Sequence, residues 1–96
     1  MLKAVDASGH VGERATVCGT AVSKTTSQGN GRPTFINLDH PFPNQTFTVV
    51  VFESDVPQTG ELPGSGNLCV TGTIALYRGT PQIVVHDAKS WHAGQP

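Results

Sequence analysis

The chain has little charge. Asp, Glu, Lys and Arg make up 14% of its 96 residues, against roughly 25% in an average globular protein. Six basic and seven acidic residues leave a formal net charge of −1. Proteins that bind duplex nucleic acid tightly carry a basic face that displaces counterions from the phosphates. One copy of this chain has at most a local basic patch, so tight non-specific binding to duplex DNA is not expected.

Long apolar runs are also missing. The sequence contains no stretch of about 18 apolar residues, so no membrane span is expected. Residues 1–6 lack the apolar core of a signal peptide. The sparse charge and the abundant Thr, Ser and Gln are also typical of an exported protein whose leader has been removed. The cellular compartment therefore stays open.

Motifs for catalysis or metal binding are absent as well. There is no glycine-rich phosphate loop and no Gly-x-Ser-x-Gly motif. A zinc site needs about three or four converging ligands, whereas the four histidines are scattered along the chain and share no single element. They are His10, His40, His86 and His92. We therefore expect no enzymatic activity, no metal and no cofactor.

Only two cysteines occur, Cys18 and Cys69, and each lies within a strand-like run. They do not form a Cys-x-x-Cys metal motif. Cysteine is among the most frequently buried residue types, so two buried free thiols are the main interpretation. A disulfide, which requires an oxidising compartment, is the alternative.

What the sequence does contain is a β pattern. Eleven Gly and seven Pro, with no long helix-forming stretch, favour a single all-β domain with many turns. Five strands are predicted, at residues 15–23, 34–39, 46–53, 67–78 and 82–86. Residues 24–31 are expected to form an exposed hairpin loop. The domain is expected to cover residues 1–96, with 1–9 and 92–96 as loose ends.

Two of these strands resemble each other. Each has a central glycine, in Val17-Cys18-Gly19-Thr20 and in Val70-Thr71-Gly72-Thr73. A glycine within a strand indicates a bulge or a sharp coil, and a small closed barrel needs strongly coiled strands. Five strands with kinks in the first and fourth indicate a five-stranded OB-type barrel with little or no helix.

The residues also resemble a known family. His10-Val11-Gly12, Thr16-Val17-Cys18-Gly19 and Phe35-Ile36-Asn37-Leu38 are similar to the OB-fold anticodon-binding domain of aspartyl- and asparaginyl-type tRNA synthetases. The later runs, Val70 to Ile74 and Tyr77 to Ile83, resemble small bacterial OB-fold proteins that bind nucleic acid. The resemblance covers about His10 to His86. It implies an OB fold and a base-stacking role for Phe35, while Asn37 stands where the synthetase family has an acidic residue.

Alternation along the second strand predicts where a ligand surface lies. Thr34, Ile36 and Leu38 share one face, whereas Phe35 and Asn37 share the other. We expect single-stranded DNA or RNA to bind the outer face of strands two and three by base stacking and sparse phosphate contacts. The candidate residues are Phe35, Asn37, Arg32, Lys24, Phe47, Tyr77 and Arg78. Phe47, with Val49 and Val51, is expected to form an apolar stripe beside Phe35.

Each candidate also has a structural interpretation. Phe35 could pack beneath a loop or against Phe47 on the next strand, and Arg78 could pair with Asp87 or Glu53. Phe42 is interpreted as a staple of the proline-rich turn, and Trp91 as a cap over the open end of the barrel. Two other functions stay open. One is a homo-oligomerisation or assembly module that uses the apolar stripe, and the other is an exported OB domain that binds a peptide or a glycan.

Overall fold

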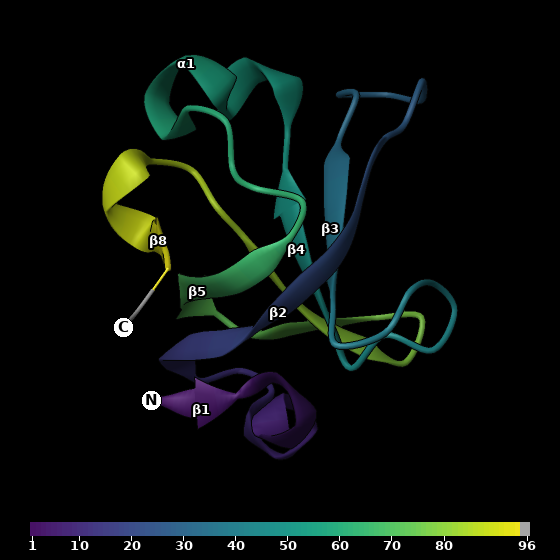
Figure 1. Ribbon diagram of the computed structural model, residues 1–96, viewed down its shortest axis with the longest axis vertical. Coiled ribbons are helices and arrows are strands. Elements are labelled where there is room, and N and C mark those ends of the chain that lie inside the picture. Colours follow the sequence, from purple (N-terminus) through teal and green to yellow (C-terminus); the bar gives the residue numbers. More distant parts are fainter. Residues whose placement is uncertain (95–96) are drawn as a thin grey trace.

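Eight strands form a single, strongly bent sheet (Figure 1). A computed structural model describes residues 1–94, and 47% of the structure is strand while 18% is helix. The strands are β1 (Leu2–Lys3), β2 (Arg14–Thr26), β3 (Thr34–Leu38), β4 (Phe47–Val51), β5 (Gly66–Thr73), β6 (Ala75–Tyr77), β7 (Thr80–Val84) and β8 (Trp91–Ala93). The short helical segments are η1 (Ala4–His10), η2 (Glu53–Asp55), α1 (Val56–Thr59) and η3 (Ala88–Ser90).

The strand order is β6-β7-β4-β3-β2-β5-β8, with β1 paired to β2. All of the pairings are antiparallel except β1 with β2 and β4 with β7, which are parallel. Within the described residues, no backbone pairing joins the two ends of this sheet. The structure therefore confirms a mostly β protein but not a five-stranded closed barrel. Four short helical segments are also present where little or no helix was expected.

The predicted strands correspond closely to the central part of the sheet. Residues 15–23, 34–39, 46–53 and 82–86 match β2, β3, β4 and β7, whose bounds differ by a few residues. The predicted strand at residues 67–78 is interrupted at Ile74, which separates β5 from β6. The 3-residue β6 then turns back along β7, with Ala75 opposite Gln82.

Strand β2 pairs with two neighbours because it is long and irregular. Its first part, up to Ala21, pairs with β5, and the part from Ala21 onward pairs with β3, so Ala21 pairs with both neighbours. The register shifts between Ala21 and Ser23, so the irregularity predicted at Gly19 lies at Val22 instead. Gly19 allows close packing, because a Cβ there would lie 3.0 Å from Cβ of Ala4.

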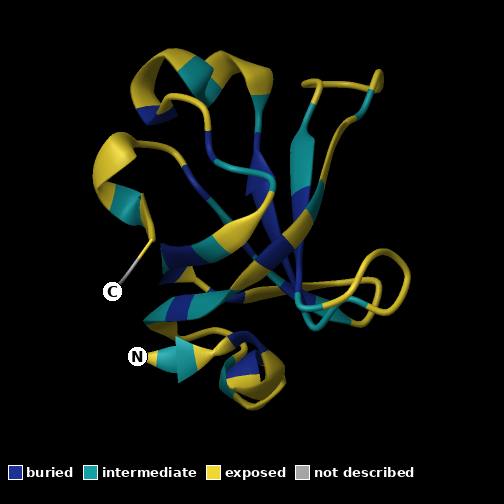
Figure 2. Ribbon diagram, viewed as in Figure 1, coloured by how far each residue is buried: buried dark blue, intermediate teal, exposed yellow. Residues whose placement is uncertain are grey.

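The core lies on the concave side of the bent sheet, where the buried residues gather (Figure 2). Ile36 and Leu38 of β3 and Val49 of β4 are fully buried. Gly72 of β5 permits a close approach to β7, since a Cβ at this position would lie 2.8 Å from Cγ2 of Ile83. Side-chain packing therefore brings β5 and β7 together.

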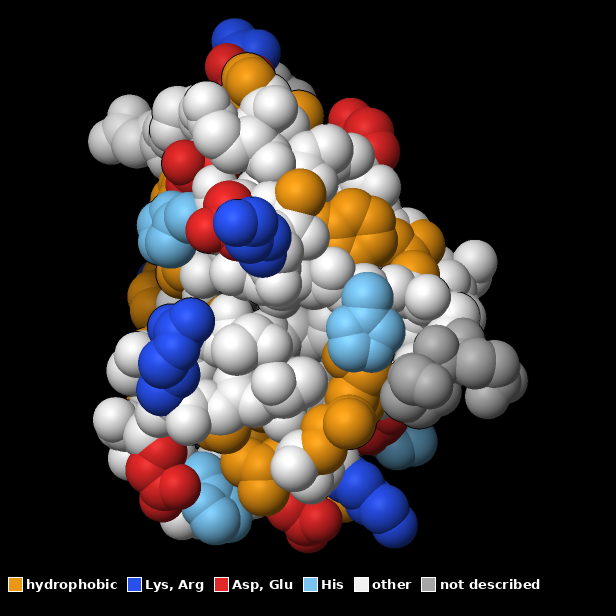
Figure 3. Space-filling model, turned by 90° about the vertical axis from the view of Figure 1, so that its left-hand side faces the viewer, with side chains coloured by type: hydrophobic (Ala, Val, Ile, Leu, Met, Phe, Trp, Pro, Cys, Tyr) orange, Lys and Arg blue, Asp and Glu red, His pale blue; other side chains and the backbone are white. Residues whose placement is uncertain are grey.

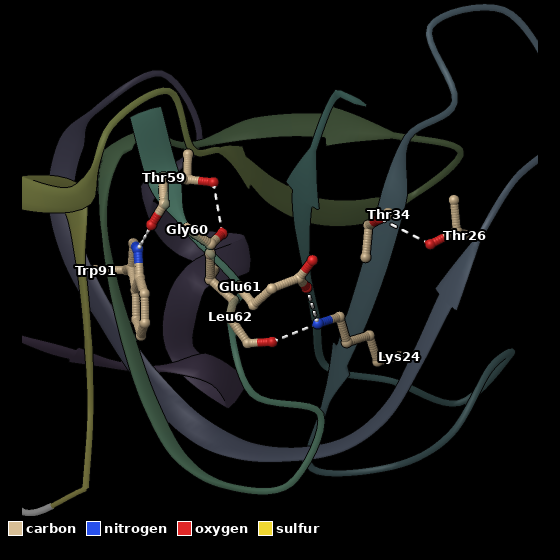
Figure 4. A network of polar contacts seen from close by, with 8 residues as sticks. All are labelled: Lys24, Thr26, Thr34, Thr59, Gly60, Glu61, Leu62 and Trp91. Atoms are coloured by element: carbon tan, nitrogen blue, oxygen red, sulfur yellow. Dashed lines mark hydrogen bonds and ion pairs between the residues drawn. The ribbon is translucent and has the colours of Figure 1, made fainter. Parts of the chain in front are cut away.

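Residues 1–9 and 92–94, which were expected to be loose ends, contribute to the sheet and the core. Leu2 pairs with Val17, and Ala4 and Ala7 are buried in the core. Strand β8 pairs with β5, and Trp91 packs against the core cluster. The indole Nε1 of Trp91 donates a hydrogen bond to the carbonyl of Thr59 at 2.9 Å (Figure 4). The rest of the predicted C-terminal loose end, residues 95–96, lies outside the described residues.

Cys18 and Cys69 lie directly opposite each other on β2 and β5 and form a disulfide. The main sequence-based interpretation, two buried free thiols, is therefore wrong, and the alternative is correct. Cys69 is fully buried and Cys18 is half-buried, so the cross-link lies at the edge of the core. It joins the two strands that also have the longest continuous pairing in the sheet.

Candidate functional site

A groove with a volume of about 530 Å³ lies over the outer face of β3 and β4. It extends from Thr25 on β2 to the loop between β3 and β4 and the turn between β6 and β7. These two connections lie side by side at the lower right of Figure 1. The groove is therefore built from segments that are distant in the sequence.

The floor of the groove follows from the register of the strands. Phe35 lies opposite Val50, and Asn37 lies opposite Thr48. Because β4 pairs in parallel with β7, Gln82 comes next to Thr48. Phe35 is half-buried and lines the groove, so its ring forms part of the floor.

Two further aromatic rings line the groove, one from the β3–β4 loop and one from the end of β6. Phe42 is 75% exposed and Tyr77 is 54% exposed. The high exposure of Phe42 shows that its ring is not the packed staple that its two flanking prolines suggested. The groove therefore receives aromatic side chains from a strand, a loop and a hairpin.

Arg78 occupies a tight turn beside Tyr77. Arg78 and Gly79 have φ values of +50° and +84°, as the two central residues of a type I′ hairpin turn require. The guanidinium carbon of Arg78 lies 5.3 Å from the centroid of the Tyr77 ring. Within the described chain, Arg78 forms no ion pair, so the expected alternative of pairing with Asp87 or Glu53 is not what the structure shows.

Phe47 does not belong to the groove. It lies opposite Leu38, is fully buried and points to the core with Val49 and Val51. The apolar stripe of Phe47, Val49 and Val51 predicted beside Phe35 is therefore wrong. Thr48 and Val50 are the β4 residues that share a face with Asn37 and Phe35. Val50, on the other face of β4, is also only 2% exposed. An exposed apolar face on this strand, which the assembly hypothesis requires, is not present.

Lys24 and Arg32 lie outside the groove. Lys24 Nζ donates to the carbonyl of Leu62 at 2.6 Å and to Oε2 of Glu61 at 2.9 Å (Figure 4). It thereby ties the segment before β5 to β2. Arg32 lies in the β2–β3 connection, where it pairs with Glu53 at 3.8 Å. Lys24, Arg32, Asn37 and Arg78 were the polar and cationic residues predicted to contact the ligand. Only Asn37 and Arg78 line the groove.

Polar side chains cross the floor as a connected series. Asn37 Nδ2 donates to Oγ of Ser23 at 3.0 Å, and Thr48 Oγ1 donates to Oδ1 of Asn37 at 3.3 Å. Gln45 Nε2 in turn donates to Oγ1 of Thr48 at 3.3 Å. Asn37 and Thr48 are each only 7% exposed, so these bonds compensate for the loss of water.

Sequence analysis missed Gln45, Thr48 and Gln82 as lining residues. The alternation within β4 and β7 marks which residues share a face, but it does not reveal that these two strands pair. Phe42 was recognised only as a structural residue. Its position between two prolines, in a short connection next to β3, was the available signal for an exposed ring at the edge of the binding face.

Charge elsewhere is dispersed. On the face shown in Figure 3, which is turned 90° from Figure 1, the Lys and Arg side chains are interspersed with Asp and Glu and form no continuous basic band. Among residues 1–94, no group of three or more His, Cys, Asp or Glu side chains is placed to hold a metal ion. No helix in the same range is long and apolar enough to cross a membrane.

Comparison with protein families and with curated proteins adds no relative. No protein-family model matches the chain, and no curated protein is significantly similar to it. The chemistry of the groove is therefore the main guide to function.

Proposed function

We propose that this protein is an OB-type domain that binds single-stranded nucleic acid in the groove over β3 and β4. The connections support this assignment. Strands β2, β3 and β4 form an antiparallel meander, β5 returns to the side of β2, and β7 lies parallel to β4. An OB fold is a five-stranded, partly open barrel that binds oligonucleotides on its second and third strands and the adjoining loops. Here those strands correspond to β3 and β4.

The observation that carries the proposal is the convergence of three aromatic rings, those of Phe35, Phe42 and Tyr77, on one groove. Each ring comes from a different part of the chain, and Phe42 and Tyr77 are largely exposed. Stacking of a base on an aromatic side chain contributes about 1–3 kcal/mol and tolerates any base sequence. Flat bases of a single strand are free to stack in this way, whereas those of a duplex already stack on one another.

The polar lining fits the same ligand. The carboxamides of Gln45 and Gln82 line the groove and can hydrogen-bond to base edges. The carboxamide of Asn37 is bonded to Ser23 and Thr48 within the floor. Arg78 supplies a cation that can contact a phosphate or stack on a base. Lys24 and Arg32 are engaged with acidic partners outside the groove. Recognition of the bases is therefore expected to outweigh recognition of the phosphates.

Fluorescence anisotropy of a labelled, mixed-sequence oligonucleotide tests the proposal. A strand of about 12 nucleotides lies within the site sizes of single OB folds. Titration with the protein at low and moderate salt should give saturable binding. The same oligonucleotide annealed to its complement serves as a control and should bind more weakly. Flat anisotropy with the single strand, up to high protein concentration, would refute the proposal.

A second candidate ligand is a neutral glycan or an extended peptide. Aromatic rings and carboxamides also suit such ligands, and among residues 1–94 the lining contains a single charged side chain, Arg78. The disulfide between Cys18 and Cys69 favours this candidate, because disulfides persist mainly in oxidising compartments. Calorimetry with a panel of neutral oligosaccharides and uncharged peptides distinguishes it from the first. Binding in that assay, with no oligonucleotide binding, would select this candidate.

A further inference from the structure

The polar series on the groove floor has a fixed direction. A threonine hydroxyl carries a single hydrogen, and Thr48 donates it to Oδ1 of Asn37. The oxygen of Thr48 can therefore only accept from its other neighbour. That neighbour, Gln45, must present its amide nitrogen to Thr48, which determines where its carbonyl oxygen lies.

Gln45 Oε1 is thus the last acceptor of the series. It is buried, and it has no hydrogen-bond partner among the described residues. Leaving a buried polar atom unpaired costs about 1–3 kcal/mol, so a donor that reaches it would be bound favourably. Gln45 belongs to the β3–β4 connection and lines the groove together with Phe35 and Phe42. The side chain that carries the unpaired acceptor therefore belongs to the same groove as the rings proposed to stack bases.

We infer that Gln45 Oε1 accepts a hydrogen bond from the Watson–Crick edge of an unpaired base that stacks in the groove. This inference rests on the proposed function. Oε1 is buried in the free protein, so binding requires the carboxamide to rotate about its soft χ3 torsion. This rotation exchanges the 3.3 Å bond from Nε2 to Oγ1 of Thr48 for the bond from the base. Each base carries an N–H donor on its Watson–Crick edge, and in a duplex that donor is already used in pairing. The acceptor therefore selects single strands by chemistry as well as by shape.

A modified oligonucleotide isolates this hydrogen bond. The probes are a thymidine strand of about 12 nucleotides and the same strand built from N3-methylthymidine, which keeps the ring but lacks the N3–H donor. The unmodified protein should bind the methylated strand about fivefold to tenfold more weakly, as expected for the loss of one hydrogen bond. The variant Gln45→Leu should bind both strands with equal affinity.

The matched control is Gln28→Leu. Gln28 is exposed in the β2–β3 connection and does not line the groove, so this variant should discriminate between the strands as the unmodified protein does. Circular dichroism checks that each variant folds. If Gln45→Leu does not fold, Gln45→Met replaces it, because the methionine side chain is similar in length to glutamine and has no amide acceptor.

The two possible failures are distinguishable. If the unmodified protein and Gln45→Leu disfavour the methylated strand equally, the methyl group acts by steric hindrance and the inference is wrong, while base stacking in the groove stands. If the unmodified protein binds neither strand, the proposed function itself is wrong, and the inference falls with it.

Discussion

Arg78 stacks against Tyr77, with its guanidinium carbon 5.3 Å from the centroid of the ring. At this distance a cation is attracted to the face of an aromatic ring. The type I′ turn at Arg78 and Gly79 holds the two side chains at the edge of the groove. Arg78 is the only cationic side chain among the described lining residues. The charge available for phosphate contact is therefore concentrated in one side chain.

The first prediction concerns the salt dependence of binding. Each phosphate of a single strand that is neutralised contributes a slope of about −0.7 to a plot of log affinity against log salt concentration. With one cation in the groove, the unmodified protein should show a slope near this value, and Arg78→Gln should reduce it toward zero. Anisotropy titrations between about 50 and 200 mM salt measure both. Arg32→Gln, outside the groove, is the control and should leave the slope unchanged. A slope several times steeper would mean that other cations contact the strand.

The second prediction concerns Phe35. Phe35→Ala removes one stacking surface from the groove floor and should weaken oligonucleotide binding about tenfold or more. Phe52→Ala is the matched control, since Phe52 is a partly buried aromatic residue that does not line the groove. It should change affinity little once thermal melting has shown that the variant is folded. Equal losses in the two variants would argue against stacking on Phe35.

The third prediction separates core from surface aromatics. Phe47 is fully buried whereas Phe42 is 75% exposed. Phe47→Ala should lower the free energy of unfolding by about 3–5 kcal/mol, because it leaves a cavity in the core. Phe42→Ala should change that free energy by less than about 0.5 kcal/mol, as surface substitutions usually do, but should weaken ligand binding. Urea denaturation followed by tryptophan fluorescence gives the stabilities. Similar destabilisation by both variants would contradict the register of β4.

The fourth prediction concerns the disulfide. Cys18 and Cys69 are separated by 51 residues, and for a loop of this length the chain-entropy model gives a stabilisation of about 4 kcal/mol, within the typical range of about 2–4 kcal/mol. A thiol reductant should therefore lower the melting temperature of the unmodified protein. The double variant Cys18→Ala and Cys69→Ala should melt at a lower temperature and should not respond to reductant. An unmodified protein that is indifferent to reductant, with two titratable thiols, would show that the cysteines are free.

The positions of the central strands were predictable because they depend on local patterns. The alternation from Thr34 to Leu38 and the turn residues on either side define β3 almost to the residue. Strands β1 and β8 were missed, because they have only 2 and 3 residues. Such short segments carry too little local pattern, and they become strands only by pairing with β2 and β5.

The candidate site was predictable to a similar extent. Phe35, Asn37, Tyr77 and Arg78 were proposed from the sequence, and all of them line one groove. Lys24 is a long cation next to a loop, which is typical of a phosphate contact as well as of a structural ion pair. Its acidic partner, Glu61, comes from a segment 37 residues away. No local pattern indicates that pairing.

The sequence by itself determined which residues alternate between the two faces of each strand, since side chains in an extended chain point to opposite sides in turn. Only the tertiary structure decided which of those faces is inside. In β4, Phe47 to Val51 is apolar on both faces, and the pairing of Leu38 with Phe47 places Phe47 in the core and Thr48 under the groove. The reason is that burial depends on contacts between distant strands, which a local pattern does not specify.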